Sequence, residues 1–212
     1  MAYDFTTSDR YTCTLQTTIA SYPFTLACWG YVDNVGNVRT LMSLTTSGSS
    51  VQGHRLVMNA TTATITAQSE DSVGNANATT TASMTIGKWY HMAAVFTSDT
   101  DRAAYIDAGN KGTNNTSKAS NTMARVAIAS RLRSNIYGNN WDGKIADAAV
   151  WTAALNDDQL NSLYRGVKPT SISPESLLFY APFVRDLVDV SGGSSFITAG
   201  APTVFPHPRR YG

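Results

Sequence analysis

The sequence predicts an all-β protein, a two-sheet antiparallel β-sandwich with one short helix and an extended C-terminal arm. Apolar and polar residues alternate over many short stretches, as they do in strands with one buried face. Hydrophobic residues make up 42% of the 212-residue chain and charged residues only 15%. Neutral polar side chains therefore cover most of the expected surface, which is typical of exposed strands rather than of long charged helices.

The first half of the chain is rich in alternating, aromatic and β-branched stretches, which favour strands. The expected strands of this half cover residues 11–15, 24–32, 38–44, 54–58 and 63–67. The glycine- and asparagine-containing segment 33–37 predicts a turn between two of them. Segment 69–78 is polar and contains glycine and asparagine, so we expect a loop there.

The second half continues the series and then changes character. Its expected strands cover residues 79–86, 89–97, 102–107, 123–129 and 142–151, followed by a short apolar strand at 177–180. Segment 108–112 predicts a turn. Residues 191–195 combine serine and glycine and predict a second, flexible turn.

One helix is well specified by local signals. Asn156 suits the N-cap, and Gln159 stands three residues later, as a capping box requires. Leu155 and Leu160 are spaced for a hydrophobic staple, and Gly166 suits the position after the C-cap. A helix of about ten residues is too short to be stable alone, so we expect it to dock on a sheet.

We expect residues 1–199 to form one sandwich domain and residues 200–212 to form an extended arm. The arm contains three prolines and shows no sheet periodicity, which favours a semi-rigid extended chain. Its predicted partner-binding residues are Val204, Phe205, Pro206, His207, Pro208, Arg209, Arg210 and Tyr211.

Charge and hydropathy narrow the classes of partner. A net charge of +1 argues against nucleic-acid binding, and the densest internal basic cluster, Arg125, Arg131 and Arg133, is expected to be solvated. No stretch is apolar over the length of a bilayer, and the N-terminus lacks the pattern of a secretory signal. Cys13 and Cys28 are therefore expected to be reduced, although a disulfide stays open if their strands are neighbours.

Four segments in order resemble a laminin-G-like, concanavalin A-like jelly-roll domain. They are Tyr22 to Trp29, Gly87 to Val95, Ala104 to Asp107, and Asp142 through the capped helix to Gly166. In the third segment, Ala108 stands where the family has a glycine. The resemblance implies two facing antiparallel sheets but supplies no function, because this fold hosts lectins, receptor modules, hydrolases and structural proteins.

Because this fold hosts glycosidases, glycoside hydrolysis is the first catalytic activity to test. It needs two carboxylates across the scissile bond. The only glutamates, Glu70 and Glu175, fall in a predicted loop and a connector, and Asp142 and Asp147 are spaced to opposite faces of one strand. No nucleophile–base pattern surrounds the three histidines, His54, His91 and His207. We therefore expect no enzymatic activity and no catalytic residues.

We also expect no cofactor and no committed metal site. Calcium binding is the alternative that we keep, because several families of this fold bind calcium. The ion would need about six to eight oxygen ligands. The residues at loop edges that could supply such ligands are Asp33, Asn34, Asp71, Asp107 and Asp142. The alternative is that these side chains only form turns.

A loop with two aromatic residues around two asparagines is the candidate glycan-binding site. It consists of Tyr137, Asn139, Asn140 and Trp141. A sugar face could stack on either ring, while the amides bind hydroxyl groups. The alternative is that Trp141 packs at the mouth of the core and the asparagines hold the turn. The other tryptophans, Trp29, Trp89 and Trp151, are expected to be packing residues.

The chain also resembles, more loosely, laminin-G-like proteins of bacteriophage virions in its size, its lack of a signal and its proline- and arginine-containing tail. This resemblance implies a non-catalytic capsid decoration (cement) protein, made in the host cytoplasm and located in the virion. Its partners would be capsid or other virion proteins, and it would form homo-oligomers. The alternatives are a glycan-binding adhesion module and, less favoured, a glycoside hydrolase.

Overall fold

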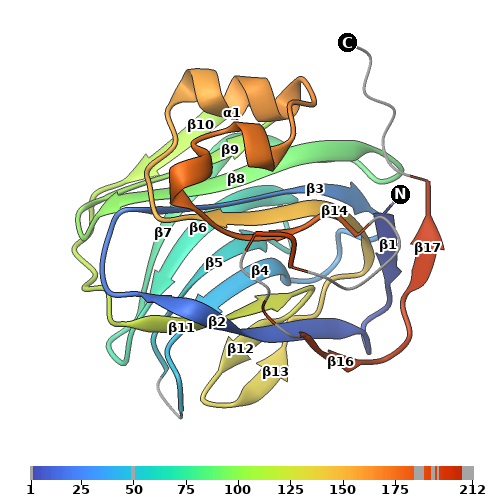
Figure 1. Cartoon of the computed structure of the whole chain (residues 1–212). Coiled ribbons are helices and arrows are strands. Elements are labelled where there is room, and N and C mark those ends of the chain that lie inside the picture. The colour runs from blue at the N-terminus through green and yellow to red at the C-terminus, as the bar shows by residue number, and fades with distance from the viewer. Residues whose placement is uncertain (1, 49–50, 184–188, 192–193, 195, 207–212) are drawn as a thin grey trace.

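The computed structural model describes residues 2–48, 51–183, 189–191, 194 and 196–206, and it confirms the two-sheet antiparallel sandwich (Figure 1). The strands of the first sheet, sheet A, are β1 (Ala2–Phe5), β3 (Phe24–Val32), β8 (Trp89–Ser98), β9 (Asp101–Ile106), β10 (Gly109–Asn114), β14 (Gly143–Trp151), β15 (Leu177–Ala181) and β17 (Thr203–Phe205). Those of the second sheet, sheet B, are β2 (Arg10–Ile19), β4 (Arg39–Thr45), β5 (Gly53–Met58), β6 (Thr64–Glu70), β7 (Asn75–Ser83), β11 (Met123–Ile128) and β16 (Phe196–Ala199).

Chain neighbours are often not sheet neighbours, as in a jelly roll. Sheet A runs β10-β9-β8-β3-β14-β1-β17, with β15 also paired to β14, and sheet B runs β16-β2-β11-β4-β5-β6-β7. A separate hairpin, β12 (Arg131–Arg133) and β13 (Ile136–Gly138), contacts β4 of sheet B. The helical segments are α1 (Asp157–Tyr164) and two 3₁₀ turns at Pro169–Ser171 and Pro174–Ser176.

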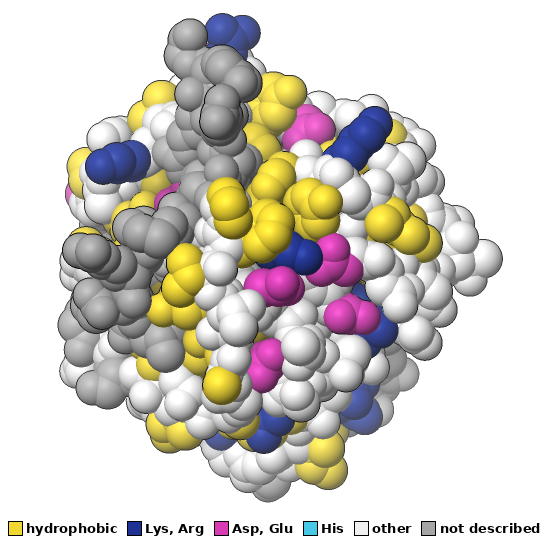
Figure 2. Space-filling view, turned by 90° about the vertical axis from the view of Figure 1, so that its right-hand side faces the viewer, with side chains coloured by type: hydrophobic (Ala, Val, Ile, Leu, Met, Phe, Trp, Pro, Cys, Tyr) yellow, Lys and Arg dark blue, Asp and Glu magenta, His cyan; other side chains and the backbone are white. Residues whose placement is uncertain are grey.

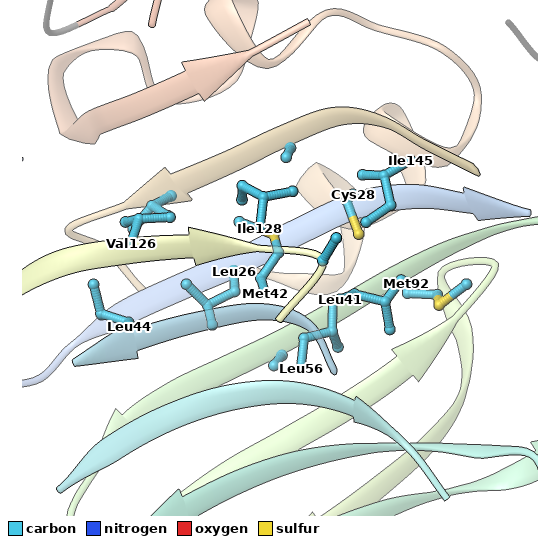
Figure 3. Close-up of a cluster of buried hydrophobic side chains, with 14 of the residues drawn as sticks. Leu26, Cys28, Leu41, Met42, Leu44, Leu56, Met92, Val126, Ile128 and Ile145 are labelled. Carbon is cyan, nitrogen blue, oxygen red and sulfur yellow. The ribbon is translucent and has the colours of Figure 1, made fainter. Parts of the chain in front are cut away.

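The main hydrophobic core lies between the two sheets. Figure 3 shows Leu26 and Cys28 of sheet A facing Met42, Leu56 and Ile128 of sheet B, and all five are 1% exposed or less. Each of these side chains belongs to the inward half of an alternating strand, so the core follows from the period-two pattern of the sequence. Both cysteines are buried free thiols on different sheets, as expected.

A second, smaller core forms where α1 packs on the outer face of sheet A. Leu160 and Leu163 of the helix contact Ala93 and Val95 of β8 and the buried indole of Trp151. The predicted capping box of Asn156 and Gln159 is confirmed. So is the glycine after the C-cap: Gly166, at a φ of 93°, donates its N–H to the carbonyl of Leu163.

Two predictions of irregular structure were wrong. Segment 69–78 is not a loop, because β6 reaches Glu70 and β7 begins at Asn75, with only a tight turn between them. Ala76 and Ala78 are buried while their neighbours on β7 are exposed, so the alternation is present but is carried by small side chains. Likewise, most of the predicted turn 108–112 belongs to β10.

The start of the C-terminal arm belongs to the sandwich. Strand β17, which contains Val204 and Phe205, pairs with β1 and forms an edge of sheet A. The sheet therefore continues past the boundary predicted at residue 199. Pro206 follows the strand and is exposed. The other predicted arm residues lie outside the described residues: His207, Pro208, Arg209, Arg210 and Tyr211.

On the opposite side, the edge strands of the two sheets touch. Strand β10 of sheet A packs against β7 of sheet B, and at Gly112 the backbones come so close that a Cβ atom would lie 1.7 Å from the carbonyl oxygen of Thr79. The absence of a side chain at this position is therefore what allows the sandwich to close there.

Candidate functional site

The outer face of sheet A carries a group of ring side chains, of which His91 is buried and the others are partly exposed. Along β3, Cys28 and Gly30 point into the core, so Trp29 and Tyr31 point outward. Strand β8 is paired with β3 so that His91 lies opposite Trp29 and Trp89 lies opposite Tyr31. Four ring side chains are thus placed in a two-by-two array by strand register alone.

Rings from α1 and β17 extend this array at its two ends. The ring of Tyr164, in the last turn of α1, stacks on Trp29 at a centroid distance of 6.0 Å. The ring of Phe205 lies 6.0 Å from that of Tyr31, which also meets Trp89 edge-on at 5.6 Å. We refer to these six residues together as the aromatic strip: Trp29, Tyr31, Trp89, His91, Tyr164 and Phe205.

Lys144 of β14 lies at the β17 end of the aromatic strip. Its Nζ atom is 4.9 Å from the ring centres of both Tyr31 and Phe205, a distance at which cation–π attraction acts. The same atom contacts Asp33 at 2.5 Å and Asp4 at 3.5 Å. Figure 2 shows such a gathering of hydrophobic side chains around a basic one, with acidic side chains beside it.

The charges around Lys144 are coupled. Burial alone would lower the pKa of Lys144, but the hydrogen bond and charge of Asp33, together with the charge of Asp4, outweigh it and raise the pKa. The lysine is therefore held as a cation. Asp4 and Asp33 keep about a third of their side-chain surface exposed (32% and 34%), so their remaining acceptor sites face solvent beside the rings.

A groove on the same face is a separate feature. It has a volume of about 590 Å³ and lies between strands β8 to β10 and the start of α1. Its polar groups bind one another: the Tyr105 hydroxyl donates to Asp157 at 2.8 Å, and Lys111 lies 3.5 Å from the same carboxylate. Tyr105 is only 4% exposed, so the groove offers no aromatic face.

The glycan-binding loop predicted from the sequence is not an open platform. Trp141 is completely buried, so its ring is not available for a sugar to stack on. Tyr137 is half-buried, with the guanidinium of Arg10 4.2 Å above its ring. Asn140 accepts from Ser130 Oγ and donates to the carbonyl of Thr7, while Asn139 is exposed. The alternative of a buried tryptophan and a turn-holding asparagine therefore describes Trp141 and Asn140.

The calcium candidates are not brought together. Among the described residues, no three His, Cys, Asp or Glu side chains form a group that could hold a metal. Each candidate instead has its own protein partner. Asp33 binds Lys144, Asn34 binds the Gly36 N–H, Asp71 binds Lys118 and two backbone N–H groups, Asp107 binds the His91 N–H, and Asp142 pairs with Arg39.

The carboxylates considered for glycoside hydrolysis are likewise dispersed. Glu70 ends β6 and pairs with Arg55 of β5 and with Arg133 of the β12–β13 hairpin. Asp147 is buried in β14 and accepts a hydrogen bond of 2.6 Å from the Tyr180 hydroxyl. Asp142 makes an ion pair with Arg39 at the start of β14.

Sequence reasoning missed the aromatic strip because it treated Trp29 and Trp89 as packing residues. Trp151 is indeed fully buried, but Trp29 and Trp89 are half-buried on the outer face. A signal was present in β3, where the large rings alternate with Cys28 and Gly30. Rings on one set of alternate positions and small residues on the other indicate that each face of the strand packs against something.

Comparison with protein families gives one match that covers most of the chain. The family model described as the concanavalin A-like lectin/glucanases superfamily matches residues 5–161. Among curated proteins, no sequence matches significantly. Within the described residues, no helix has the length and apolar character needed to cross a membrane.

Solved structures share the fold at low sequence identity. A heptameric SAP-like pentraxin from Limulus polyphemus is 16% identical, with a TM-score of 0.61, and the match covers 91% of this chain and 95% of the pentraxin. The CBM40 domain of the IT-sialidase of Ruminococcus gnavus, solved with α2,3-sialyllactose, is 12% identical, with a TM-score of 0.59 and coverages of 77% and 96%.

A bacteriophage protein is also similar. Tailspike protein 2 of an Escherichia coli O157:H7 phage is 15% identical, with a TM-score of 0.59. The match covers 83% of this chain but only 26% of the tailspike. At these identities the three similarities show the jelly-roll fold alone.

Proposed function

We propose that this chain, which belongs to the concanavalin A-like lectin/glucanases superfamily, is a non-catalytic glycan-binding module that uses the aromatic strip. The observation that supports this most is the array of partly exposed rings with Asp4, Asp33 and Lys144 beside it. Ligand sites combine apolar and aromatic surface with a few placed polar groups, and this face has both.

The chemistry of a sugar matches these groups. The C–H face of a pyranose ring packs on an aromatic ring, and Trp89 and Tyr31 supply two rings whose planes meet at 66°, with partly exposed carboxylates nearby. The exposed acceptor positions of Asp4 and Asp33 can bind hydroxyl groups, and the ammonium of Lys144 fixes both carboxylates in place. Because the strip spans β8, β3 and β17, it fits an oligosaccharide rather than a single sugar.

Two further facts support binding without catalysis. The two carboxylates beside the aromatic strip at Lys144, Asp4 and Asp33, share that lysine instead of facing each other across an open space, as a hydrolytic pair requires. The similar CBM40 domain was solved with a bound sialyllactose. By the same reasoning, we expect incubation with a bound glycan to release no new reducing ends.

The proposal is tested by replacing Trp89 with alanine. A glycan array identifies a bound oligosaccharide, and calorimetry then measures its dissociation constant for the wild type and for Trp89→Ala. Losing one stacked ring costs about 1 kcal/mol or more, so we expect the dissociation constant to rise by roughly ten-fold. The melting temperature of each variant shows that the fold is retained.

Tyr137→Ala is the matched control, because it removes another half-buried ring, one whose hydroxyl contacts Thr12 of sheet B. It should leave the affinity unchanged. Loss of binding in Tyr137→Ala with retention in Trp89→Ala would move the site to the loop and contradict the proposal. Binding to no glycan would contradict it as well.

A virion protein that decorates a capsid is the second candidate. Its specific support is the similarity to the phage tailspike, together with an edge strand, β17, formed by the beginning of the C-terminal arm. In this function the residues after β17 extend to a neighbouring virion subunit, and repetition on a symmetric shell adds avidity.

Deletion of residues 201–212 tests this second function. It removes β17 and all following residues, so we expect association with capsids or with other copies of the chain to be lost. Association is measured by co-sedimentation, with Ile197→Ala as the control, because Ile197 is an exposed apolar residue of β16 outside the predicted partner-binding set. Unchanged association after the deletion would exclude the arm from the attachment.

A further inference from the structure

Three arginines and one carboxylate lie together on the outer face of sheet B, away from the aromatic strip. Arg55 lies on β5 between the core residues His54 and Leu56, which places its side chain on the outer face. Arg131 and Arg133 come from β12 of the hairpin that packs on this sheet. Glu70 stands at the end of β6.

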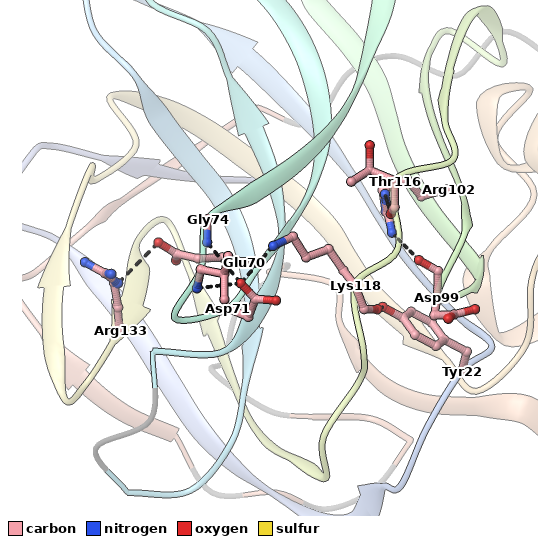
Figure 4. A network of polar contacts seen from close by, with 10 residues as sticks. Tyr22, Glu70, Asp71, Gly74, Asp99, Arg102, Thr116, Lys118 and Arg133 are labelled. Carbon is pink, nitrogen blue, oxygen red and sulfur yellow. Dashed lines mark hydrogen bonds and ion pairs between the residues drawn. The ribbon is translucent and has the colours of Figure 1, made fainter.

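Glu70 is shared by two of the arginines. Its carboxylate pairs with the guanidinium of Arg55 and lies 3.2 Å from Nε of Arg133, a contact visible in Figure 4. Arg55 also donates to Gln68 at 2.7 Å. The nearby carboxylate of Asp71 binds Lys118 at 2.8 Å.

Arg131, unlike Arg55 and Arg133, does not pair with Glu70. Among the described residues it makes no ion pair, and its Nε atom is buried without a hydrogen-bond acceptor. Its guanidinium lies against Gly138 of the paired strand, where an added Cβ would be 3.4 Å from Nη2. The side chain is thus held in place by packing, while its Nε donor has no acceptor among the described residues.

The cluster is therefore unbalanced, with three guanidinium groups around one carboxylate. Burial lowers the pKa of Arg55 to about 9, with further lowering by the charges of Arg131 and Arg133. Burial and the charge of Arg133 also lower the pKa of Arg131. Burial is the larger cause of both shifts, and the mutual repulsion of the guanidinium groups adds to it. An added anion would relieve both.

Access to the cluster is from the solvent side of the hairpin. The side chain of Arg133 is 40% exposed, Arg131 is half-buried, and Arg55 forms the buried floor with 4% of its side chain exposed. Planar guanidinium forks bind the two oxygens of an oxyanion side by side. The arrangement therefore suits one oxyanion group that approaches Arg131 and Arg133 from outside.

We infer that Arg131 and Arg133, backed by Arg55, form a second binding site that accepts the carboxylate or sulfate group of an acidic polysaccharide. A polysaccharide is favoured over nucleic acid because the net charge is only +1 and the cluster is compact, whereas a duplex is held by many phosphate contacts along a basic face. This site does not depend on the aromatic strip, and Trp89→Ala should leave it intact.

The test compares wild type with Arg131→Gln, a substitution that removes the charge without breaking an ion pair of the described residues. Binding of polygalacturonate, dextran sulfate and neutral dextran is measured by calorimetry at physiological salt. We expect wild type to bind at least one acidic polymer and not dextran. In Arg131→Gln that affinity should fall about ten-fold, as loss of one charge-assisted contact implies.

Arg165→Gln is the control, because it removes an equal charge from an exposed position next to α1 and should change affinity less than two-fold (~0.4 kcal/mol). Which polymer binds better decides between carboxylate and sulfate. The inference is overturned if wild type binds neither acidic polymer, if Arg131→Gln binds as well as wild type, or if Arg165→Gln loses as much. Tighter binding of a short DNA duplex would overturn it in favour of nucleic acid.

Discussion

At the scale of single residues, His54 is a buried imidazole in an apolar setting. Its ring lies 4.8 Å from that of Phe24 and 5.0 Å from that of Phe96, and its Nδ1 atom is 3.0 Å from Ser69 Oγ. Burial, followed by the positive charges of Arg102 and Arg55, lowers its pKa from 6.5 to about 3. The folded protein therefore holds His54 neutral under conditions in which an unfolded chain protonates it.

This difference predicts a loss of stability in mild acid. A lowered pKa in the folded state means that the unfolded state binds the proton first, so the free energy of unfolding falls as the pH drops from about 6.5 towards 3. The contribution of His54 over this window is on the order of a few kcal/mol. Urea unfolding at several pH values measures it.

His54→Phe is the matched variant, because it keeps a ring among the neighbouring aromatic rings but cannot be protonated. The carboxylates that titrate in the same range are present in both proteins, so only the histidine contribution differs. We expect a flatter dependence of the unfolding free energy on pH in His54→Phe. Equal slopes for the two proteins between pH 6.5 and 3 would show that His54 is not the cause.

Residue type also explains which part of the site could be predicted. A tryptophan on an alternating strand is expected to lie on the buried face of its sheet. Sheet A, however, is covered on both faces, on one by sheet B and on part of the other by α1. Trp151 lies under the helix, while Trp29 and Trp89 lie where its cover ends. That limit is a property of tertiary packing, and no local sequence pattern encodes it.

At the scale of elements, the backbones of the two sheets come very close together at Gly112. A Cβ atom at this position would overlap the carbonyl group of Thr79. The backbones of both residues are held in their sheets, so neither can easily move aside. We expect Gly112→Ala to force β10 away from β7 and to lower the free energy of unfolding by roughly 3 kcal/mol, as overpacking does. Chemical denaturation measures this change.

Gly36→Ala is the control for this prediction, because a Cβ at Gly36 would meet its nearest atom, Asn34 Oδ1, at 3.4 Å in an exposed turn. It should change stability by less than about 1 kcal/mol, as surface substitutions do. If the two glycine variants were equally stable, close contact between β10 and β7 would not be required for the fold.

The elements differ in how far their sequences determine them. The helix could be predicted almost to the residue, because the cap at Asn156, the staple at Leu155 and the final Gly166 are all local signals. Strand β7 could not, because its buried positions hold two alanines and a threonine, and alanine is depleted in strands and gives no strong β signal. Strands β1 and β17 depend on each other across the whole chain, and no short-range pattern marks that pairing.

At the scale of the whole molecule, the two outer faces of the sandwich are chemically different. Sheet A carries rings and one lysine, Lys144, that is shared by two carboxylates. Sheet B carries an excess of arginine around Glu70. A polymer that has both apolar sugar faces and acidic groups could contact the rings of sheet A and the arginines of sheet B. The variants Trp89→Ala and Arg131→Gln each change one face of the protein, so they separate the two contributions.

The pairing of β1 with β17 determines where the chain can be cut and rejoined. Ala2 stands opposite Phe205 in adjacent strands, so the first and last described strands lie side by side at one edge of sheet A (Figure 1). A short linker between them, with new ends cut in the exposed turn near Gly36, gives a circularly permuted chain that has the same strand neighbours. Fusion partners attached at either end would likewise leave from the same corner, which keeps both broad faces clear.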